Sequence, residues 1–185
     1  VLKALPGIAT SGKPDVRSAR GRFDYPLRTE YSVSLKQAEK EFAEAEKKLA
    51  DFEKDPALAD TRLADAARVE FFKSDQRLRI ARRYFSGGRR PATRSLEQMA
   101  VRIGDAVFVT YPGELFSEIG LAIKESSPME KTYVIGLTCG PGGYLPSARE
   151  FPEGDYEVNG SAYSPLTEKF CIESSVSLIK QVAGD

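Results

Sequence analysis

The sequence predicts an α/β fold: a mixed β-sheet with flanking helices, plus a long antiparallel αα-hairpin. Three observations support this. Apolar side chains recur every three or four residues over Leu35–Phe52 and again over Ala64–Phe85, which is the period of amphipathic helices. Ala106–Tyr111 and Thr132–Thr138 are short apolar runs of the kind that form buried strands. A segment with helical periodicity joins those two runs, and a strand–helix–strand unit usually places its strands parallel.

Composition limits the possible classes of protein. The chain has 185 residues, 41% of them hydrophobic and 29% charged, as in an ordinary globular domain. Lys+Arg and Asp+Glu are 27 each, so no global basic field is available for nucleic acid. No apolar run reaches the ~18 residues of a membrane span. We therefore expect one domain with no nucleic-acid partner and no transmembrane segment. Its start at Val1 suggests a piece of a longer protein.

The N-terminal region gives the weakest signals. Residues 1–20 contain glycine, proline and small polar residues without a sustained period, so we expect an irregular lead-in, with a short strand possible at Val1–Leu5. Phe23–Val33 is expected to be extended. Pro26 cannot donate a ladder hydrogen bond and therefore places this segment at a sheet edge.

The helical hairpin is expected over residues 34–86, with an α/β part over 95–185. Ser34 and Gln37 match a capping box, and Asp55-Pro56 ends the first helix. The second helix is expected from about Ala57 to Phe85. Two helices joined by a short turn form an antiparallel pair that could also mediate homo-oligomer formation.

Charges around the hairpin allow two interpretations. The acidic and basic residues of the first helix are balanced, as on a solvated face. A more one-sided cluster follows, formed by Arg79, Arg82, Arg83, Arg89, Arg90 and Arg94. It could face anionic lipid headgroups or a partner, or it could be favourable cation placement near a helix C-terminus followed by a solvated loop. We favour the second interpretation.

The α/β part is predicted element by element. We expect a strand, a tight hairpin turn, a central strand covered on both faces, a helix, a further core strand and a last helix. In order, these are Ser95–Ile103, Gly104-Asp105, Ala106–Tyr111, Glu114–Glu125, Thr132–Thr138 and a helix from Ser164-Pro165 to Ala183-Gly184.

The side chains available for chemistry are few. The chain has no histidine, which excludes a Ser-His-Asp triad or a His-liganded zinc from this chain alone. Glu114 follows a Pro-Gly turn at a strand end, where it could be a metal ligand or general base, or simply complement a helix dipole. Tyr144 follows the glycine-rich run 139–143, where it could reach into a site or pack beneath a turn. That run lacks the Lys-Ser/Thr of a phosphate-binding loop. Cys139 and Cys171 could form a disulfide or be two buried thiols.

An ordered set of motifs resembles the C-terminal part of the catalytic domain of neutral/alkaline non-lysosomal ceramidases, nearest to short bacterial ceramidase-like proteins. The matching segments are Tyr111-Pro112-Gly113-Glu114-Leu115-Phe116, Gly143-Tyr144-Leu145-Pro146-Ser147, Phe151 and Gly154-Asp155-Tyr156-Glu157. The resemblance extends from about Val101 to Gln181.

The resemblance implies a zinc-dependent amidohydrolase that cleaves the N-acyl amide of ceramide or a related lipid amide. It implies that Glu114 is a zinc ligand and that Tyr144 is a ligand or stabilises the tetrahedral oxyanion. The family's two zinc histidines have no counterpart here, since this chain has none. The N-terminal half of the same protein would then be a necessary partner, and the chain alone would be inactive. The resemblance also suggests a secreted or periplasmic protein.

A hypothesis from another class stays open. The chain could be a non-catalytic interaction or scaffold module with a degenerate site and with the hairpin as its docking surface. Two zinc-spaced histidines upstream of Val1 would favour the enzyme, and their absence would favour the module.

Overall fold

The computed structural model describes residues 12–31, 33–86, 91–154 and 156–184. The chain forms two compact units, each built from separate stretches of sequence. The sheet unit comprises Val1–Phe23, Leu96–Gly142 and Lys169–Asp185, and the hairpin unit comprises Asp24–Ser95 and Gly143–Glu168. In the described part of the chain, no helix combines the length and apolar character needed to cross a membrane.

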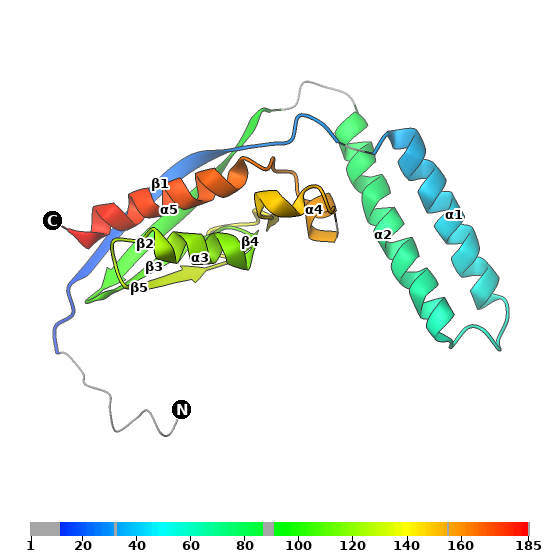
Figure 1. Ribbon diagram of the computed structural model, residues 1–185, viewed down its shortest axis with the longest axis horizontal. Helices are drawn as coiled ribbons and strands as arrows, with labels where there is room; N and C mark the ends of the chain where they lie inside the picture. The colour runs from blue at the N-terminus through cyan, green and yellow to red at the C-terminus, as the bar shows by residue number, and fades with distance from the viewer. Residues whose placement is uncertain (1–11, 32, 87–90, 155, 185) are drawn as a thin grey trace. The chain divides into compact units, whose positions relative to one another are not determined.

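A mixed four-stranded sheet organises the first unit and confirms the predicted α/β class (Figure 1). Its strand order is β1-β2-β3-β5. The strands are β1 (Val16–Pro26), β2 (Thr93–Ile103), β3 (Ala106–Thr110) and β5 (Lys131–Ile135). As predicted, β2 and β3 are antiparallel and turn at Gly104-Asp105, where Gly104 supplies a positive φ of 62°. The predicted parallel pairing also holds, between β3 and β5.

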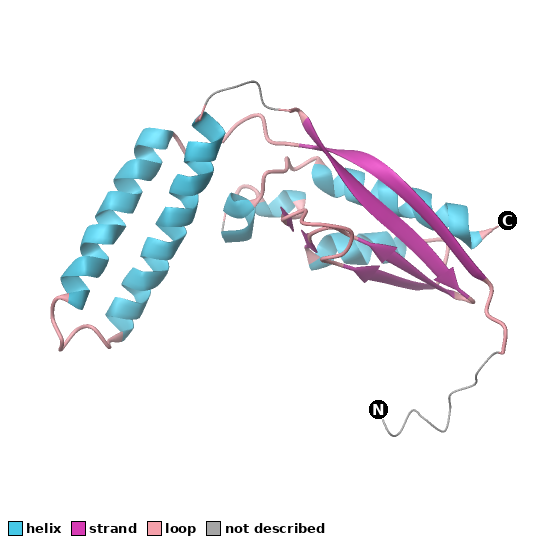
Figure 2. Cartoon of the chain, turned by 180° about the vertical axis from the view of Figure 1, so that it is seen from behind, coloured by secondary structure: helices cyan, strands magenta, loops and turns pink. Residues whose placement is uncertain are grey.

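Both helices of this unit cover the same face of the sheet, as the opposite views of Figures 1 and 2 show. These helices are α3 (Ser117–Glu125) and α5 (Thr167–Ala183). The core between helices and strands is formed by Val107, Val109, Ile119, Ile123, Leu178, Ile179 and Val182. On the other face, Phe108 stacks on Tyr133 with ring centroids 5.2 Å apart, and Tyr133 stays 47% exposed. The expected double coverage of β3 is therefore wrong: its burial alternates, as in a strand with one covered face.

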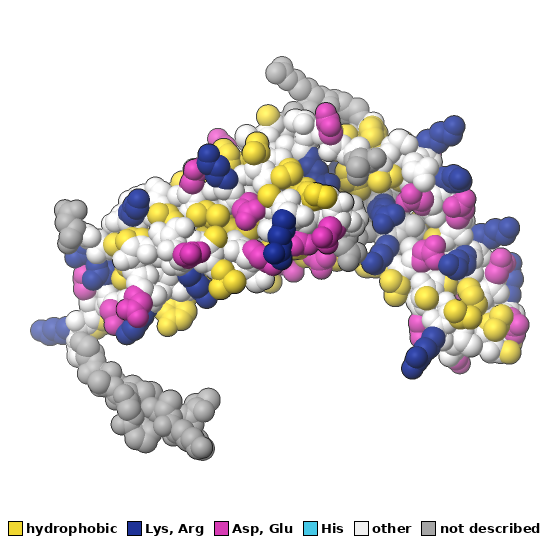
Figure 3. Space-filling view, viewed as in Figure 1, with side chains coloured by type: hydrophobic (Ala, Val, Ile, Leu, Met, Phe, Trp, Pro, Cys, Tyr) yellow, Lys and Arg dark blue, Asp and Glu magenta, His cyan; other side chains and the backbone are white. Residues whose placement is uncertain are grey.

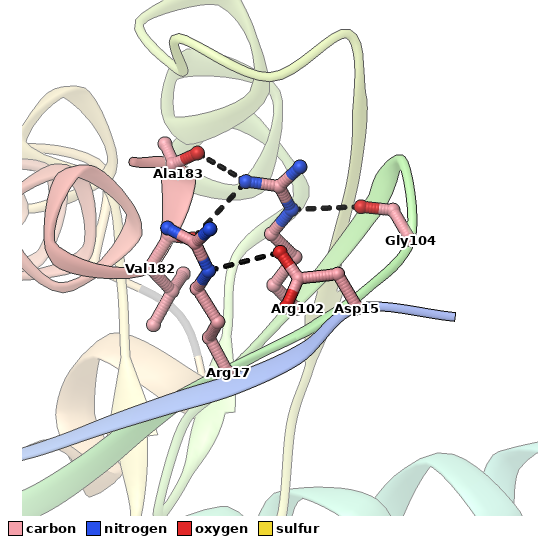
Figure 4. A network of polar contacts seen from close by, with 6 residues as sticks. All are labelled: Asp15, Arg17, Arg102, Gly104, Val182 and Ala183. Atoms are coloured by element: carbon pink, nitrogen blue, oxygen red, sulfur yellow. Dashed lines mark hydrogen bonds and ion pairs between the residues drawn. The ribbon is translucent and has the colours of Figure 1, made fainter. Parts of the chain in front are cut away.

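One arginine secures the C-terminal end of α5 (Figure 4). The Nη1 of Arg102 donates to the carbonyl oxygens of Val182, at 3.4 Å, and Ala183, while its Nε donates to Gly104 at 2.7 Å. These carbonyls are among the last four of the helix, which have no partner within it, and a cation there also complements the helix dipole. Arg102 thus joins α5 to the β2–β3 turn.

Strand β1 differs from the expectation of an irregular lead-in. It begins at Val16, so residues 16–20 belong to it, and Val1–Leu5 lie outside the described residues. Arg20 and Arg22 lie 3.4 and 3.6 Å from the carboxylate of Glu97. An edge strand held by its backbone and carrying charged side chains has no apolar alternation, which is why its sequence gave little signal. The edge position expected from Pro26 is confirmed.

The predicted αα-hairpin is present in the second unit as α1 (Leu35–Glu53) and α2 (Arg62–Phe85). Ser34 caps α1 by accepting from the backbone N–H of Gln37 at 3.2 Å. The second helix begins five residues later than expected, because Asp55 accepts from Ala57 and Leu58 (both 2.9 Å) and forms a turn instead. Figure 3 shows basic and acidic side chains interspersed over the hairpin.

Small side chains bring the two hairpin helices together. Ala38, Leu78 and Ala81 form a buried cluster, and Phe42 and Phe71 lie 5.5 Å apart. The amide of Gln37 donates to Glu41 at 2.9 Å rather than returning to the cap, and Arg77 donates to Glu41 at 3.1 Å. The Gln37 hydrogen bond and, less strongly, the Arg77 contacts lower the pKa of Glu41. The hairpin unit also contains β6 (Tyr144–Leu145), a 3₁₀ turn (Ala148–Glu150) and α4 (Tyr156–Gly160).

Candidate functional site

Glu114 stands just past the end of the central strand β3. The chain leaves β3 at Thr110, turns through Tyr111-Pro112-Gly113 and enters the two-residue strand β4 (Glu114–Leu115). The three turn residues are buried, whereas Glu114 is exposed. The helix expected to start at Glu114 begins at Ser117 instead, with Phe116 at its N-cap. The alternative role as a dipole partner at the helix start is therefore wrong for Glu114, since Glu118 occupies the first turn.

The glycine-rich segment after β5 clamps this turn. The backbone N–H groups of Leu137 and Gly142 donate to the carbonyls of Gly113 (3.0 Å) and Pro112. The N–H of Thr138 donates to Tyr111 at 2.7 Å. A Cβ on Gly142 would lie 2.7 Å from the carbonyl carbon of Pro112, so a side chain there would displace backbone. The clamp fixes the path of the chain into Glu114, and it needs glycine for close approach.

The clamping segment has an unusual backbone. Leu137 and Cys139 are non-glycine residues with positive φ, 57° and 62°, and Gly140 has a φ of 122°. Such conformations cost about 1–3 kcal/mol for non-glycine residues and persist where the surroundings impose them. Strained backbone conformations are most frequent at functional sites, so these residues support the hypothesis that the turn before Glu114 is part of one.

A buried polar network lies behind the turn. The hydroxyl of Tyr111 donates to the carbonyl of Cys171 at 2.7 Å and accepts from Ser175 at 3.3 Å. Gln98, 0% exposed, donates to the carbonyl of Thr110 (3.3 Å) and to Ser175 (3.4 Å). These bonds tie the end of β3 to α5, and they support the turn from below.

Tyr144 belongs to the hairpin unit. Its ring is half-buried and packs edge-on against Tyr156, with centroids 5.8 Å apart. Ser161 donates to the carbonyl of Tyr144 at 2.9 Å. A Cβ on Gly160 would lie 3.2 Å from the Tyr144 ring, so the small residue there makes room for it. Tyr144 is thus fixed within its unit, both at its backbone and at its ring.

The two predicted site residues are therefore held by different units: Glu114 by the sheet unit and Tyr144 by the hairpin unit. Across the described residues there is no group of three or more His, Cys, Asp or Glu side chains placed to hold a metal ion. Both cysteines are free thiols. Cys171 is buried, but Cys139 is exposed, so the disulfide is wrong and only one of the two expected buried thiols is buried.

Some of the residues around these sites were missed by the sequence-based reasoning. Gln98 had a signal, since the alternation of Leu96, Gln98 and Ala100 places it on the core face of β2. Arg28 and Tyr31, which line a cavity described below, had none. Their neighbours in space come from α2 and from residues 160–162, far away in the sequence.

Solved structures resemble part of this chain. No protein-family model matches the chain, and no curated protein matches it. Among solved structures, a ceramidase complexed with C2 aligns with 48% of this chain at 19% identity and a TM-score of 0.42. Neutral ceramidase from Pseudomonas aeruginosa aligns with 47% at 19% identity and a TM-score of 0.39. The aligned part is 15% and 16% of those chains, respectively.

Proposed function

We propose that this chain is part of a zinc-dependent amidohydrolase resembling neutral ceramidase, acting on the N-acyl amide of ceramide or a related lipid amide. The observation that carries the proposal is the clamped Tyr111-Pro112-Gly113 turn, which leads into the exposed Glu114 at the end of β3. That turn carries the Pro-Gly-Glu triplet, and the Gly-Tyr and Tyr-Glu motifs of the family resemblance follow it in order. Strand ends of open α/β sheets are a usual place for such sites.

The donor chemistry of the two residues fits zinc. A carboxylate oxygen is a common zinc ligand, and a phenol can act as a ligand or donate a hydrogen bond. Bound zinc would lower the pKa of a coordinated water and polarise the amide carbonyl. In this proposal Glu114 supplies the negative charge that helps to hold the ion. Tyr144 supplies a ligand or a proton donor directed at the oxyanion.

The remaining ligands would come from the N-terminal half of the same protein, because this chain has no histidine. The 185-residue chain by itself is therefore expected to bind zinc weakly and to lack amidase activity. Tight stoichiometric zinc in a titration of the pure chain would contradict this division of the metal shell.

The test uses the full-length gene product. Its zinc content and its hydrolysis of a ceramide are measured for the wild type, Glu114→Ala and Tyr144→Phe. Glu125→Ala is the matched control, because Glu125 is also an exposed carboxylate of the sheet unit and ends α3. We expect Glu114→Ala to lose both zinc and activity, while Glu125→Ala keeps both. Unchanged zinc and activity in Glu114→Ala would refute the ligand assignment, and a zinc-free wild type would favour the non-catalytic module.

A further inference from the structure

A cavity of about 370 Å³ lies within the hairpin unit, between its lead-in segment, the end of α2 and residues 160–162. Its polar wall includes the side chains of Arg28, Arg83, Arg94 and Tyr31. Leu27 and Ile80 contribute apolar surface. Its volume is within the range of small-molecule sites, about 300–1,000 Å³. Among the described residues that line it there is no Asp or Glu, so the wall is basic.

Arg28 is the most constrained cation of this wall. Its Nε donates to the carbonyl of Tyr163 at 3.1 Å, and one Nη donates to the carbonyl of Val158. Its guanidinium also lies 4.9 Å from the ring centroid of Phe151. These partners are neutral, and no carboxylate in the described part of the chain accepts a hydrogen bond from Arg28. Two carbonyls use two of the five guanidinium N–H groups, so donors and a half-buried positive charge remain for a ligand.

Tyr31 contributes a second donor. Its hydroxyl oxygen is buried and has no hydrogen-bond partner among the described residues. Buried polar atoms are normally paired, so an orphan hydroxyl on a side chain that lines a cavity indicates a missing partner. Burial and, less strongly, the nearby carboxylate of Glu41 raise the pKa of Tyr31, against the opposing charges of Arg28 and Arg77. The phenol therefore stays protonated at neutral pH and can donate.

We propose that this cavity binds an organic oxyanion, a carboxylate or a phosphate ester attached to an apolar group. The oxyanion would accept from Arg28 and the Tyr31 hydroxyl, and the apolar group would lie against Leu27 and Ile80. The positive charge of Arg28, with no Asp or Glu among the described lining residues, disfavours a cation. Charge-assisted hydrogen bonds favour an ionised oxygen over a neutral one. This inference goes beyond the proposed hydrolase function and does not depend on zinc.

The experiment is calorimetric titration of the zinc-free, full 185-residue chain with octanoate, octyl phosphate and octanol. We expect saturable 1:1 binding of at least one of the two anions, and binding of octanol at least about tenfold weaker. If octanoate binds more tightly than octyl phosphate, the natural ligand is a carboxylate; the reverse order indicates a phosphate ester. Inorganic phosphate binding as tightly as octyl phosphate and octanoate would overturn the apolar half of the proposal.

Tyr31→Phe is the decisive variant, because it removes only the orphan hydroxyl and should leave the fold intact. We expect this variant to bind the anion roughly tenfold more weakly, because it loses one hydrogen bond to a charged group. Tyr133→Phe, on the exposed face of the sheet unit, is the matched control and should bind like the wild type. Arg28→Lys should weaken binding too, although it also disturbs the two carbonyl contacts. Unchanged affinity in Tyr31→Phe, or octanol binding as tightly as the anions, would overturn the proposal.

Discussion

The hydroxyl of Tyr111 should contribute measurably to the stability of the sheet unit. Tyr111 is 0% exposed, and its hydroxyl donates to the Cys171 carbonyl while it accepts from Ser175. Tyr111→Phe removes both of these buried hydrogen bonds, each worth about 1 kcal/mol, and leaves the Ser175 hydroxyl without this acceptor, whereas the Cys171 carbonyl still accepts from Ser174 at 3.2 Å. A buried polar group left unsatisfied costs about 1–3 kcal/mol, so we expect a total loss of about 1–3 kcal/mol.

The assay is urea unfolding of the chain, followed by circular dichroism and analysed by linear extrapolation. Tyr133→Phe is the same chemical change on a side chain that is 47% exposed and keeps its stacking on Phe108. Its free energy of unfolding should stay within about 0.5 kcal/mol of the wild type. If the two variants lose the same stability, the network behind the turn does not stabilise the unit as described.

Two further perturbations test the clamp and the hairpin. Gly142→Ala places a Cβ against backbone and should lower the free energy of unfolding by about 1–3 kcal/mol. In α3, the Cβ of Gly120→Ala meets open space, so this variant should raise the free energy of unfolding by about 0.5–1 kcal/mol. Equal effects of Gly142→Ala and Gly120→Ala in urea unfolding would contradict the clamp. The pKa of Glu41 is lowered in the folded chain, so its contribution is present above its ordinary value of 4.5 and is lost as the pH falls through the folded value. Glu41→Gln should therefore flatten the acid dependence of hairpin stability, whereas Glu39→Gln, with an exposed side chain on the same helix, should leave it unchanged.

The parts of the fold that were predictable are those whose signal is local. The apolar period of the hairpin, the Ser34 cap and the Gly104-Asp105 turn each depend on a few neighbouring residues, and each was found in the structure. The helix starts were less accurate. Asp55 and Thr61 determine where α2 begins: the Asp55 side chain accepts from Ala57 in a turn that competes with helix formation, and the Thr61 side chain caps the helix by accepting from Ala64.

What could not be predicted depends on contacts between distant segments. Strand β1 is recognisable only beside β2, because its own side chains are mostly charged or exposed. For the candidate site, the position of Glu114 after the strand end was readable from Pro112-Gly113. The clamp by Gly142 was not, because it joins two loops through their backbones, and backbone contacts leave no side-chain pattern.

The interleaving of the two units has a consequence for the order of folding. The hairpin is built from neighbouring helices and so has short loops to close, which favours fast, early formation. The sheet unit must instead bring β1 beside β2 across the whole hairpin sequence, and its core is completed only by α5 at residues 167–183. During synthesis the strands therefore emerge long before the helix that covers them. The contacts of Arg102 with the last turn of α5 can form only once synthesis has passed residue 183.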